Sequence, residues 1–223
     1  MKVGLIKRKE CWVPTARGWL VVAVLFLACS ATVVRSLDSF LSVNHPIAAD
    51  VLIVEGWLPD YALRDAVEEF KHGGYKYVIT SGGADPEIRL WSHYETWADA
   101  AAADLGRMGM QTNLIVPVPS VYHSRDRTYS AAMAVKEWLA SRSNEVHAVN
   151  VYSLAAHARR TRLLFQKAFG SKVKVGIFAH PESAYNARRW WTTSEGVRDV
   201  EGETTAYLYA RCIFPFVPKE SKE

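Results

Sequence analysis

The chain has few cysteines, and their positions limit what can stabilise it. Among its 223 residues, only Cys11, Cys29 and Cys212 are cysteines, and Cys212 stands alone beyond the N-terminal apolar stretch. A single cysteine cannot form an intramolecular disulfide, so the core of this C-terminal region must stabilise it unaided.

Several short motifs that define common binding and catalytic sites are also missing. The sequence contains neither GxGxxG nor GxxxxGK[ST], which leaves classical dinucleotide and P-loop binding unsupported. It contains no GxSxG, which argues against an α/β-hydrolase. Its seven histidines are spread out, without HExxH or another ligand spacing, so we predict no metal site.

The excess of one charge sign over the other is small, and the only dense basic run is at the N-terminus. The net charge is +4, and the remaining Lys and Arg residues are scattered, so we expect no nucleic-acid partner. No repeat, low-complexity tract or long linker is evident. With 49% apolar residues, the chain has material for about one globular domain with a real core.

The N-terminal segment has the pattern of a signal anchor. Residues 1–17 carry five basic residues against one acid, and residues 18–34 then carry no charge at all. Seventeen helical residues reach about 26 Å, near the lower limit for a membrane span. We predict a cytoplasmic basic segment at 1–17 and a transmembrane signal anchor at 18–36. The positive flank places the following domain outside an inner or plasma membrane that the chain crosses once.

Two other interpretations of the same segment remain open. Ala28-Cys29-Ser30 resembles a signal-peptidase site, and Leu27-Ala28-Cys29 resembles a lipoprotein site, although Phe26 and Leu27 fit the latter poorly. Apolar sequence continues past Cys29 to Val34, which favours an anchor that is kept.

After a connector at 37–48, residues 49–214 show the alternation of an α/β domain, and 215–223 form a tail. Near-continuous apolar runs of strand length alternate with helical segments of ten or more residues. This order predicts a Rossmann-like, doubly wound, mainly parallel sheet behind one transmembrane helix. The expected strands are 50–55, 77–80, 114–116, 146–154 and 173–178, and the expected helices are 60–72, 90–108, 128–141, 155–165 and 197–212.

The fourth strand and its helix form the stretch around which the chain is organised. His157 falls where this strand gives way to its helix, and Arg160 lies one helical turn further on the same face. Strand ends in open α/β sheets bind ligands, and helix N-termini attract anions. An imidazole beside a guanidinium suits a phosphate or carboxylate ligand, or proton transfer to one. The alternative is that His157 caps the helix and Arg160 is a surface charge.

Other candidate groups follow the remaining strands or lie on the helices, and each has an ordinary structural alternative. Ser81-Gly82-Gly83 would bring backbone amides close to an anion, or would simply form a turn. Asp126 and Thr128 lie in the charged loop Ser124–Thr128 after the third strand, where both can cap a helix. Three further residues, each of which can be a surface charge or a structural partner, are Arg64 on the first helix, Glu95 on the second, and Glu203 near Tyr207 on the last.

Together these residues resemble a known family. The pattern is similar to the YdcF/SanA/ElyC-like domain-of-unknown-function family of envelope proteins. The matching residues occur in family order over about residues 49–212, and the chain departs from the pattern at Trp57, where the family has a second glycine. The matching elements are Asp50–Val54, Arg64, Ser81-Gly82-Gly83, Glu95, Thr128, His157-x-x-Arg160 and Glu203 ahead of Tyr207.

The resemblance implies a membrane-anchored protein of cell-envelope homeostasis, concerned with peptidoglycan or a lipid carrier. We expect an enzyme, a hydrolase or transferase, acting on an anionic, lipid-linked or phosphorylated precursor at the membrane. Its catalytic residues would be His157, Glu95 and Glu203, with ligand binding by Arg64, Ser81, Gly82, Gly83, Asp126, Thr128 and Arg160. We predict no cofactor, although one branch of the family admits S-adenosylmethionine. A non-catalytic module for a nucleoside-like ligand and an envelope scaffold remain alternatives, and the sequence does not fix the oligomeric state.

Arg188-Arg189-Trp190-Trp191 is a further candidate for contact with the membrane. Cations beside indoles suit a membrane interface. The alternative is that the tryptophans pack on the core beside the last helix.

Overall fold

The computed structural model describes residues 11–85, 88, 93–121, 126–142 and 145–214. Its contacts divide the chain into two units, Met1–Ser36 and Leu37–Glu223. Helix α1, Ala16–Leu41, is long and apolar enough to cross a membrane, and none of its most apolar stretch is buried. This is compatible with a signal anchor or a signal sequence.

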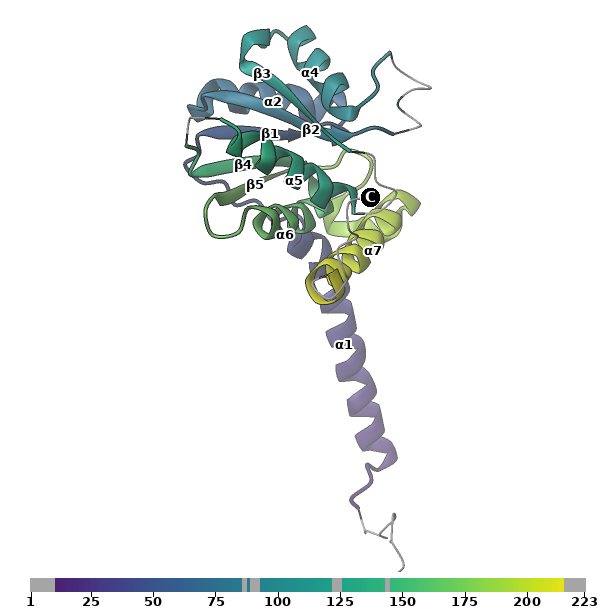
Figure 1. The fold of residues 1–223 in the computed structure, drawn as a ribbon. Coiled ribbons are helices and arrows are strands. Elements are labelled where there is room, and N and C mark those ends of the chain that lie inside the picture. Colours follow the sequence, from purple (N-terminus) through teal and green to yellow (C-terminus); the bar gives the residue numbers. More distant parts are fainter. Residues whose placement is uncertain (1–10, 86–87, 89–92, 122–125, 143–144, 215–223) are drawn as a thin grey trace, which may run out of the picture. The chain divides into compact units, whose positions relative to one another are not determined.

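The second unit is built on a five-stranded sheet in the order β3-β2-β1-β4-β5, in which every strand pairing is parallel. The predicted Rossmann-like α/β class is therefore confirmed (Figure 1). The strands are β1 Val51–Glu55, β2 Tyr77–Gly83, β3 Ile115–Ser120, β4 Ala148–Leu154 and β5 Lys174–His180. The helices are α2 Asp60–Gly73, α4 Trp97–Arg107, α5 Arg127–Ala140, α6 Ala158–Phe169 and α7 Ser194–Leu208, with short helical turns η1 Thr112–Leu114, η2 Ala155–His157, η3 Ala187–Thr192 and η4 Tyr209–Ile213.

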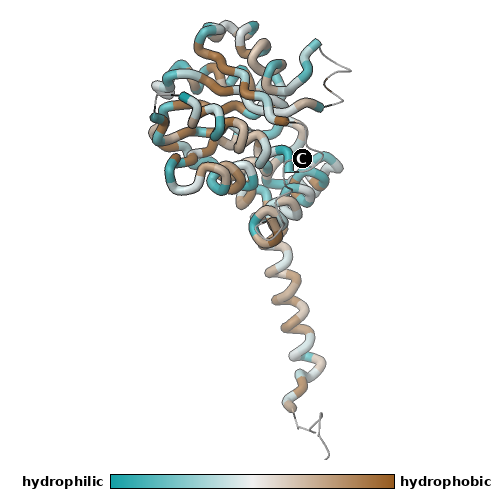
Figure 2. The backbone as a smooth tube through the Cα atoms, in the orientation of Figure 1, coloured by the Kyte–Doolittle hydropathy of each residue, from teal (hydrophilic) through white to brown (hydrophobic). Residues whose placement is uncertain are grey.

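The two faces of the sheet are covered by different helices because successive strand residues point to opposite sides. On β1, Val51 and Ile53 belong to a core cluster that also takes in residues of α5 and α6. Leu52 and Val54 belong to a second cluster, with residues of α2 and α4. All five residues of β1 are buried, as expected for a central strand of a doubly wound sheet. Figure 2 shows hydrophobic colouring along the strands and along much of α1.

Two element boundaries differ from the expected ones for physical reasons. Strand β3 continues through Pro117 and Pro119, which is tolerated because β3 is an edge strand and loses no hydrogen bond on its open side. Helix α4 begins only at Trp97, since Thr96 caps it by accepting a hydrogen bond from the amide of Asp99. Leu90, the expected start, lies outside the described residues.

The last turn of α1 belongs to the globular unit and is not part of a connector. Leu41 is fully buried, in a third cluster with Ala156, Tyr185, Trp190 and Val200. Asp38 is buried as well, and accepts a hydrogen bond from the Tyr185 hydroxyl at 3.1 Å. The globular unit therefore starts at about Leu37, and the segment predicted as connector contributes to its core.

The Arg188–Trp191 stretch lies in η3. Trp190 is only 4% exposed and packs in the third cluster, so for this residue the packing alternative holds. Trp191 is partly buried against the same cluster, while Arg188 and Arg189 are exposed.

Candidate functional site

The candidate site lies where the strand order changes direction. β1 and β4 are adjacent in the sheet, and the helices that follow them, α2 and α6, pack on opposite faces. This is the position at which open α/β sheets form a crevice for ligands. A cavity of about 960 Å³ opens there. The strand ends that line it are Glu55, Ser81–Gly83, Ser120 and Leu154.

A backbone distortion at the end of β4 brings His157 to this crevice. Ala155 has a positive φ of 34°, a conformation that L-residues rarely adopt. It begins η2, and the chain turns there directly into α6, with His157 at the N-cap position. The imidazole makes no capping hydrogen bond. The capping alternative for His157 is therefore wrong, and its side chain is available for other contacts.

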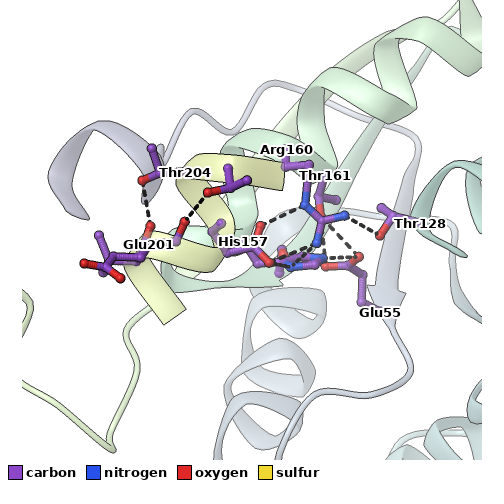
Figure 3. A network of polar contacts seen from close by, with 11 residues as sticks. Glu55, Thr128, His157, Arg160, Thr161, Glu201 and Thr204 are labelled. Carbon is purple, nitrogen blue, oxygen red and sulfur yellow. Dashed lines mark hydrogen bonds and ion pairs between the residues drawn. The ribbon is translucent and has the colours of Figure 1, made fainter. Parts of the chain in front are cut away.

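The imidazole of His157 is held between two carboxylates. Its Nδ1 atom lies 2.9 Å from Oε1 of Glu203, and its Nε2 atom lies 3.5 Å from Oε1 of Glu55 (Figure 3). The Nε2 atom is buried and has no hydrogen-bond partner among the described residues. The indole of Trp57 packs edge-on against the ring, with centroids 4.8 Å apart.

Arg160 forms a two-pronged ion pair with Glu203. Its Nε and Nη2 atoms donate to the two oxygens of Glu203 at 2.8 and 2.9 Å, and Nη1 donates to the hydroxyl of Thr128 at 3.3 Å. Nη2 also lies 3.0 Å from Nδ1 of His157. Nδ1 can accept from Arg160 or donate to Glu203, but it cannot do both. The ion pair with Arg160 keeps Glu203 ionised, and a carboxylate can only accept a hydrogen bond. We therefore place a proton on Nδ1, which donates it to Glu203.

Glu55 is the buried end of this network. It is 4% exposed, and its Oε2 atom accepts a hydrogen bond of 2.5 Å from the hydroxyl of Ser153. The hydroxyl of Thr161 donates to the same carboxylate at 3.2 and 3.3 Å. These hydrogen bonds stabilise the ionised form of a carboxylate that is almost fully buried.

The charges of the network shift one another's pKa values. Burial alone would lower the pKa of His157, but the negative charges of Glu55 and Glu203 raise it to about 9. Burial would raise the pKa of Glu203, but its hydrogen bonds to His157 and Arg160 lower it to about 2. Glu55 likewise has a lowered pKa, because the nearby imidazolium outweighs burial. At neutral pH, His157 is therefore an imidazolium, which can give up a proton but cannot accept one.

The Ser81-Gly82-Gly83 segment lies at the cavity, but it is part of β2 and does not form a separate loop. A Cβ atom on Gly82 would lie 2.7 Å from Cβ of Trp97, and one on Gly83 would lie 2.8 Å from the hydroxyl of Ser120. Close packing against Trp97 and Ser120 is enough to require both glycines. The predicted approach of an anion to their amides stays a prediction.

The structure gathers most of the predicted site residues and leaves two outside. Eight of the predicted residues line the cavity: His157 and Glu203, which were predicted to be catalytic, and Ser81, Gly82, Gly83, Asp126, Thr128 and Arg160, which were predicted to bind a ligand. Arg64 is exposed on α2 and is not a lining residue. Glu95 is exposed ahead of the Thr96 cap, so it does not lie on a helix as expected, and it does not line the cavity either. Ser124 and Arg125 lie outside the described residues.

Two residues of the site were not predicted from the sequence. Glu55 was counted only as the end of a strand, and Trp57 only as a departure from a glycine pattern. An acid that closes an otherwise apolar, fully buried strand was the available signal for Glu55, since such a charge needs partners. Trp57 carried no comparable signal, because its contact with His157 depends on the tertiary fold.

Among the described residues, no three His, Cys, Asp or Glu side chains are placed to hold a metal ion. Comparison with protein-family models and with curated proteins found no match for this chain.

Proposed function

We propose that this chain is a membrane-tethered enzyme of the cell envelope that uses His157 as a general acid on a phosphorylated precursor. One observation carries the proposal: His157, whose imidazole lies between the carboxylates of Glu55 and Glu203, lines a large cavity at the carboxyl edge of the sheet. An imidazolium whose Nε2 atom makes no hydrogen bond within the described part of the chain is suited to protonating a leaving group. The envelope setting and the precursor rest on the resemblance to the YdcF/SanA/ElyC-like family.

In this proposal the substrate is a phosphate or diphosphate ester. Water attacks phosphorus, and the P–O bond that breaks is the ester bond of a monophosphate or the phosphoanhydride bond of a diphosphate. The departing oxygen takes a proton from Nε2 of His157. The proton released by the attacking water then restores the imidazolium. Glu203 keeps Nδ1 protonated and holds Arg160 in place. Glu203 and Arg160 are therefore positioning residues, which act by orienting and charging His157.

Trp57 has a defined part in this scheme. Nε2 of His157 is buried, and the indole that packs on the ring is itself 36% exposed. The chain before Trp57 is closely packed, because a Cβ on Gly56 would lie 2.4 Å from the carbonyl oxygen of Trp97. We therefore assign to Trp57 the role of a cover, whose side chain rotates to open Nε2 to a ligand.

The test is release of inorganic phosphate from polyprenyl phosphate and diphosphate by the purified full-length chain in detergent. We expect turnover by the wild type, loss of turnover in His157→Gln, and retention in Arg64→Ala, whose side chain lies outside the cavity. Arg160→Lys keeps the charge but loses the two-pronged bond to Glu203, so turnover should fall sharply. No turnover by the wild type on either substrate would remove the proposal.

The orientation in the membrane is part of the same proposal. With the N-terminus in the cytoplasm, a reporter that is active only outside the cytoplasm should be active when fused after Glu223. A stable but inactive fusion would contradict this orientation.

A second candidate is a non-catalytic module for a nucleoside-like or S-adenosylmethionine-like ligand. Asp126, Glu182 and Asp199 line the cavity and have no ion-pair partner among the described residues, which suits a hydroxylated or cationic ligand. Saturable thermal stabilisation by S-adenosylmethionine, with no product formed, would favour this candidate over the enzyme.

A further inference from the structure

Exposed apolar side chains gather where the globular unit begins. Phe40, Leu208 and Ile213 are 44%, 54% and 56% exposed. Phe40 packs edge-on against Tyr207 at 5.6 Å between centroids, so the end of α1 and the end of α7 form one surface.

Cations border these apolar side chains. The guanidinium of Arg159 lies 3.9 Å from the centre of the Phe40 ring, and its Nε atom donates to the Phe40 carbonyl. Lys167 lies 6.0 Å from the centre of the Phe214 ring. Helix α6 carries three arginines and one lysine and no acidic residue, and η4 carries Arg211 and no acidic residue. Apolar side chains flanked by cations are typical of surfaces that rest on anionic lipid.

The chain itself brings this surface to a bilayer. Phe40 follows Ser36, the last residue of the predicted span, by four positions. Four residues reach at most about 14 Å, and the headgroup layer on each side of the hydrocarbon core is about 5–8 Å thick. When the span is inserted, chain length alone therefore keeps Phe40 within about 14 Å of the hydrocarbon core, in or close to the headgroup layer.

We infer that Phe40, Leu208 and Ile213, with Arg159, Lys167 and Arg211, form a surface that docks on anionic lipid headgroups. This surface adjoins the site. Tyr209 and Phe214 belong to its C-terminal part and also line the cavity. A ligand with a lipid tail thus reaches the cavity without leaving the membrane interface. Within the function proposed above, on which this inference rests, the substrate is therefore an amphiphile presented by the membrane.

The natural Cys212 permits a direct test, because it is exposed within this surface. In the full-length chain with Cys11→Ser and Cys29→Ser, Cys212 is labelled with an environment-sensitive fluorophore. The protein is reconstituted into liposomes of phosphatidylglycerol and phosphatidylcholine that contain spin-labelled headgroups as quenchers. The matched control carries the label at His72→Cys, an exposed position at the end of α2 near the amino edge of the sheet, in a background that also has Cys212→Ser.

We expect severalfold stronger quenching at Cys212 than at the control position. The Lys167→Glu/Arg211→Glu double variant should reduce the quenching towards the control value, as should liposomes of phosphatidylcholine alone. Equal quenching at the two positions overturns the inference, and so does strong quenching that the charge reversal leaves unchanged. The inference also fails if the protein does not co-float with the liposomes, because the predicted span would then not attach the chain to the membrane. The assay needs no turnover, so its result is separate from that of the phosphate-release test.

Discussion

At the scale of single residues, the state of His157 depends on carboxylates that only the folded chain supplies. Glu55→Gln keeps the shape of the side chain and its hydrogen bonds to Ser153 and Thr161 but removes the buried charge. The pKa of His157 should fall, and the free energy of unfolding should decrease by about 1–3 kcal/mol. Chemical denaturation measures this change. The control Glu68→Gln removes an exposed partner of Lys71 and should change stability by less than about 0.5 kcal/mol.

A second effect at this scale concerns the strained backbone of Ala155. Glycine adopts a positive φ without the Cβ clash, so Ala155→Gly should stabilise the chain by about 0.5–1 kcal/mol. Ala155→Val should destabilise it, because a β-branched side chain is worse at this φ and position 155 is 8% exposed. Thermal unfolding of the two variants checks the order. A less stable glycine variant would mean that the turn into α6 is not strained.

At the scale of elements, the last turn of α1 is part of the core beneath the site. Leu41 packs with Ala156, which precedes His157, and with Val200, one turn before Glu203 on α7. Leu41→Ala should lower the free energy of unfolding by about 2–5 kcal/mol. It should also loosen the contact between His157 and Glu203, which lowers the pKa of His157.

Leu27→Ala is the matched control for this substitution. It lies on the same helix but is 66% exposed, so the stability of the globular unit in detergent should be unchanged. Equal effects of the two substitutions would show that Leu41 has no special part in the core.

The helices and strands could be predicted from the sequence where the local pattern of apolar and turn residues determines them. The apolar runs at 51–54 and 148–154 indicated buried parallel strands. Helix α2 ends at Gly73, one residue beyond the expected end, and His157 lies at the junction of β4 and α6 as predicted. The start of α4 was misplaced, because no glycine or proline separates residue 90 from the alanine-rich helix that begins after Thr96. The extent of β3 was underestimated because prolines argue against a strand unless it is at an edge, and strand order is a tertiary property.

The candidate site was predictable only in part for the same reason. His157 and Arg160 lie one helical turn apart, so local helical geometry brings them together. Residues that end neighbouring strands, such as Glu55 and Leu154, are gathered at one edge by any parallel sheet. Glu203 comes to His157 and Arg160 from the last helix, and the sequence alone does not place that helix. Arg64 and Glu95 had the right residue type and order for the resemblance, but the fold turns them away from the cavity.

At the scale of the whole molecule, the ion network should shape how stability depends on pH. The pKa of His157 is raised from 6.5 to about 9, so its stabilising contribution is complete below pH 6.5 and is lost as the pH rises through 9. The pKa of Glu203 is lowered from 4.5 to about 2, so its contribution is complete above pH 4.5 and is lost as the pH falls through 2.

Stability should therefore decline between pH 6.5 and 9, and His157→Gln should remove that decline. Unfolding temperatures of the full-length chain in detergent, taken as wild type minus His157→Gln across pH, isolate the contribution of this residue. A difference that grows with pH above 6.5 would have the wrong sign for a raised pKa.

The central claim is that His157 is held as an imidazolium between Glu55 and Glu203. Exchange of the histidine C2 proton for deuterium, followed across pH by mass spectrometry on the full-length protein in detergent, gives the pKa of each histidine. The account predicts a pKa of about 9 for His157 and a lower value, nearer to the ordinary 6.5, in Glu203→Gln. A wild-type pKa at or below 6.5, or one that Glu203→Gln leaves unchanged, would contradict it.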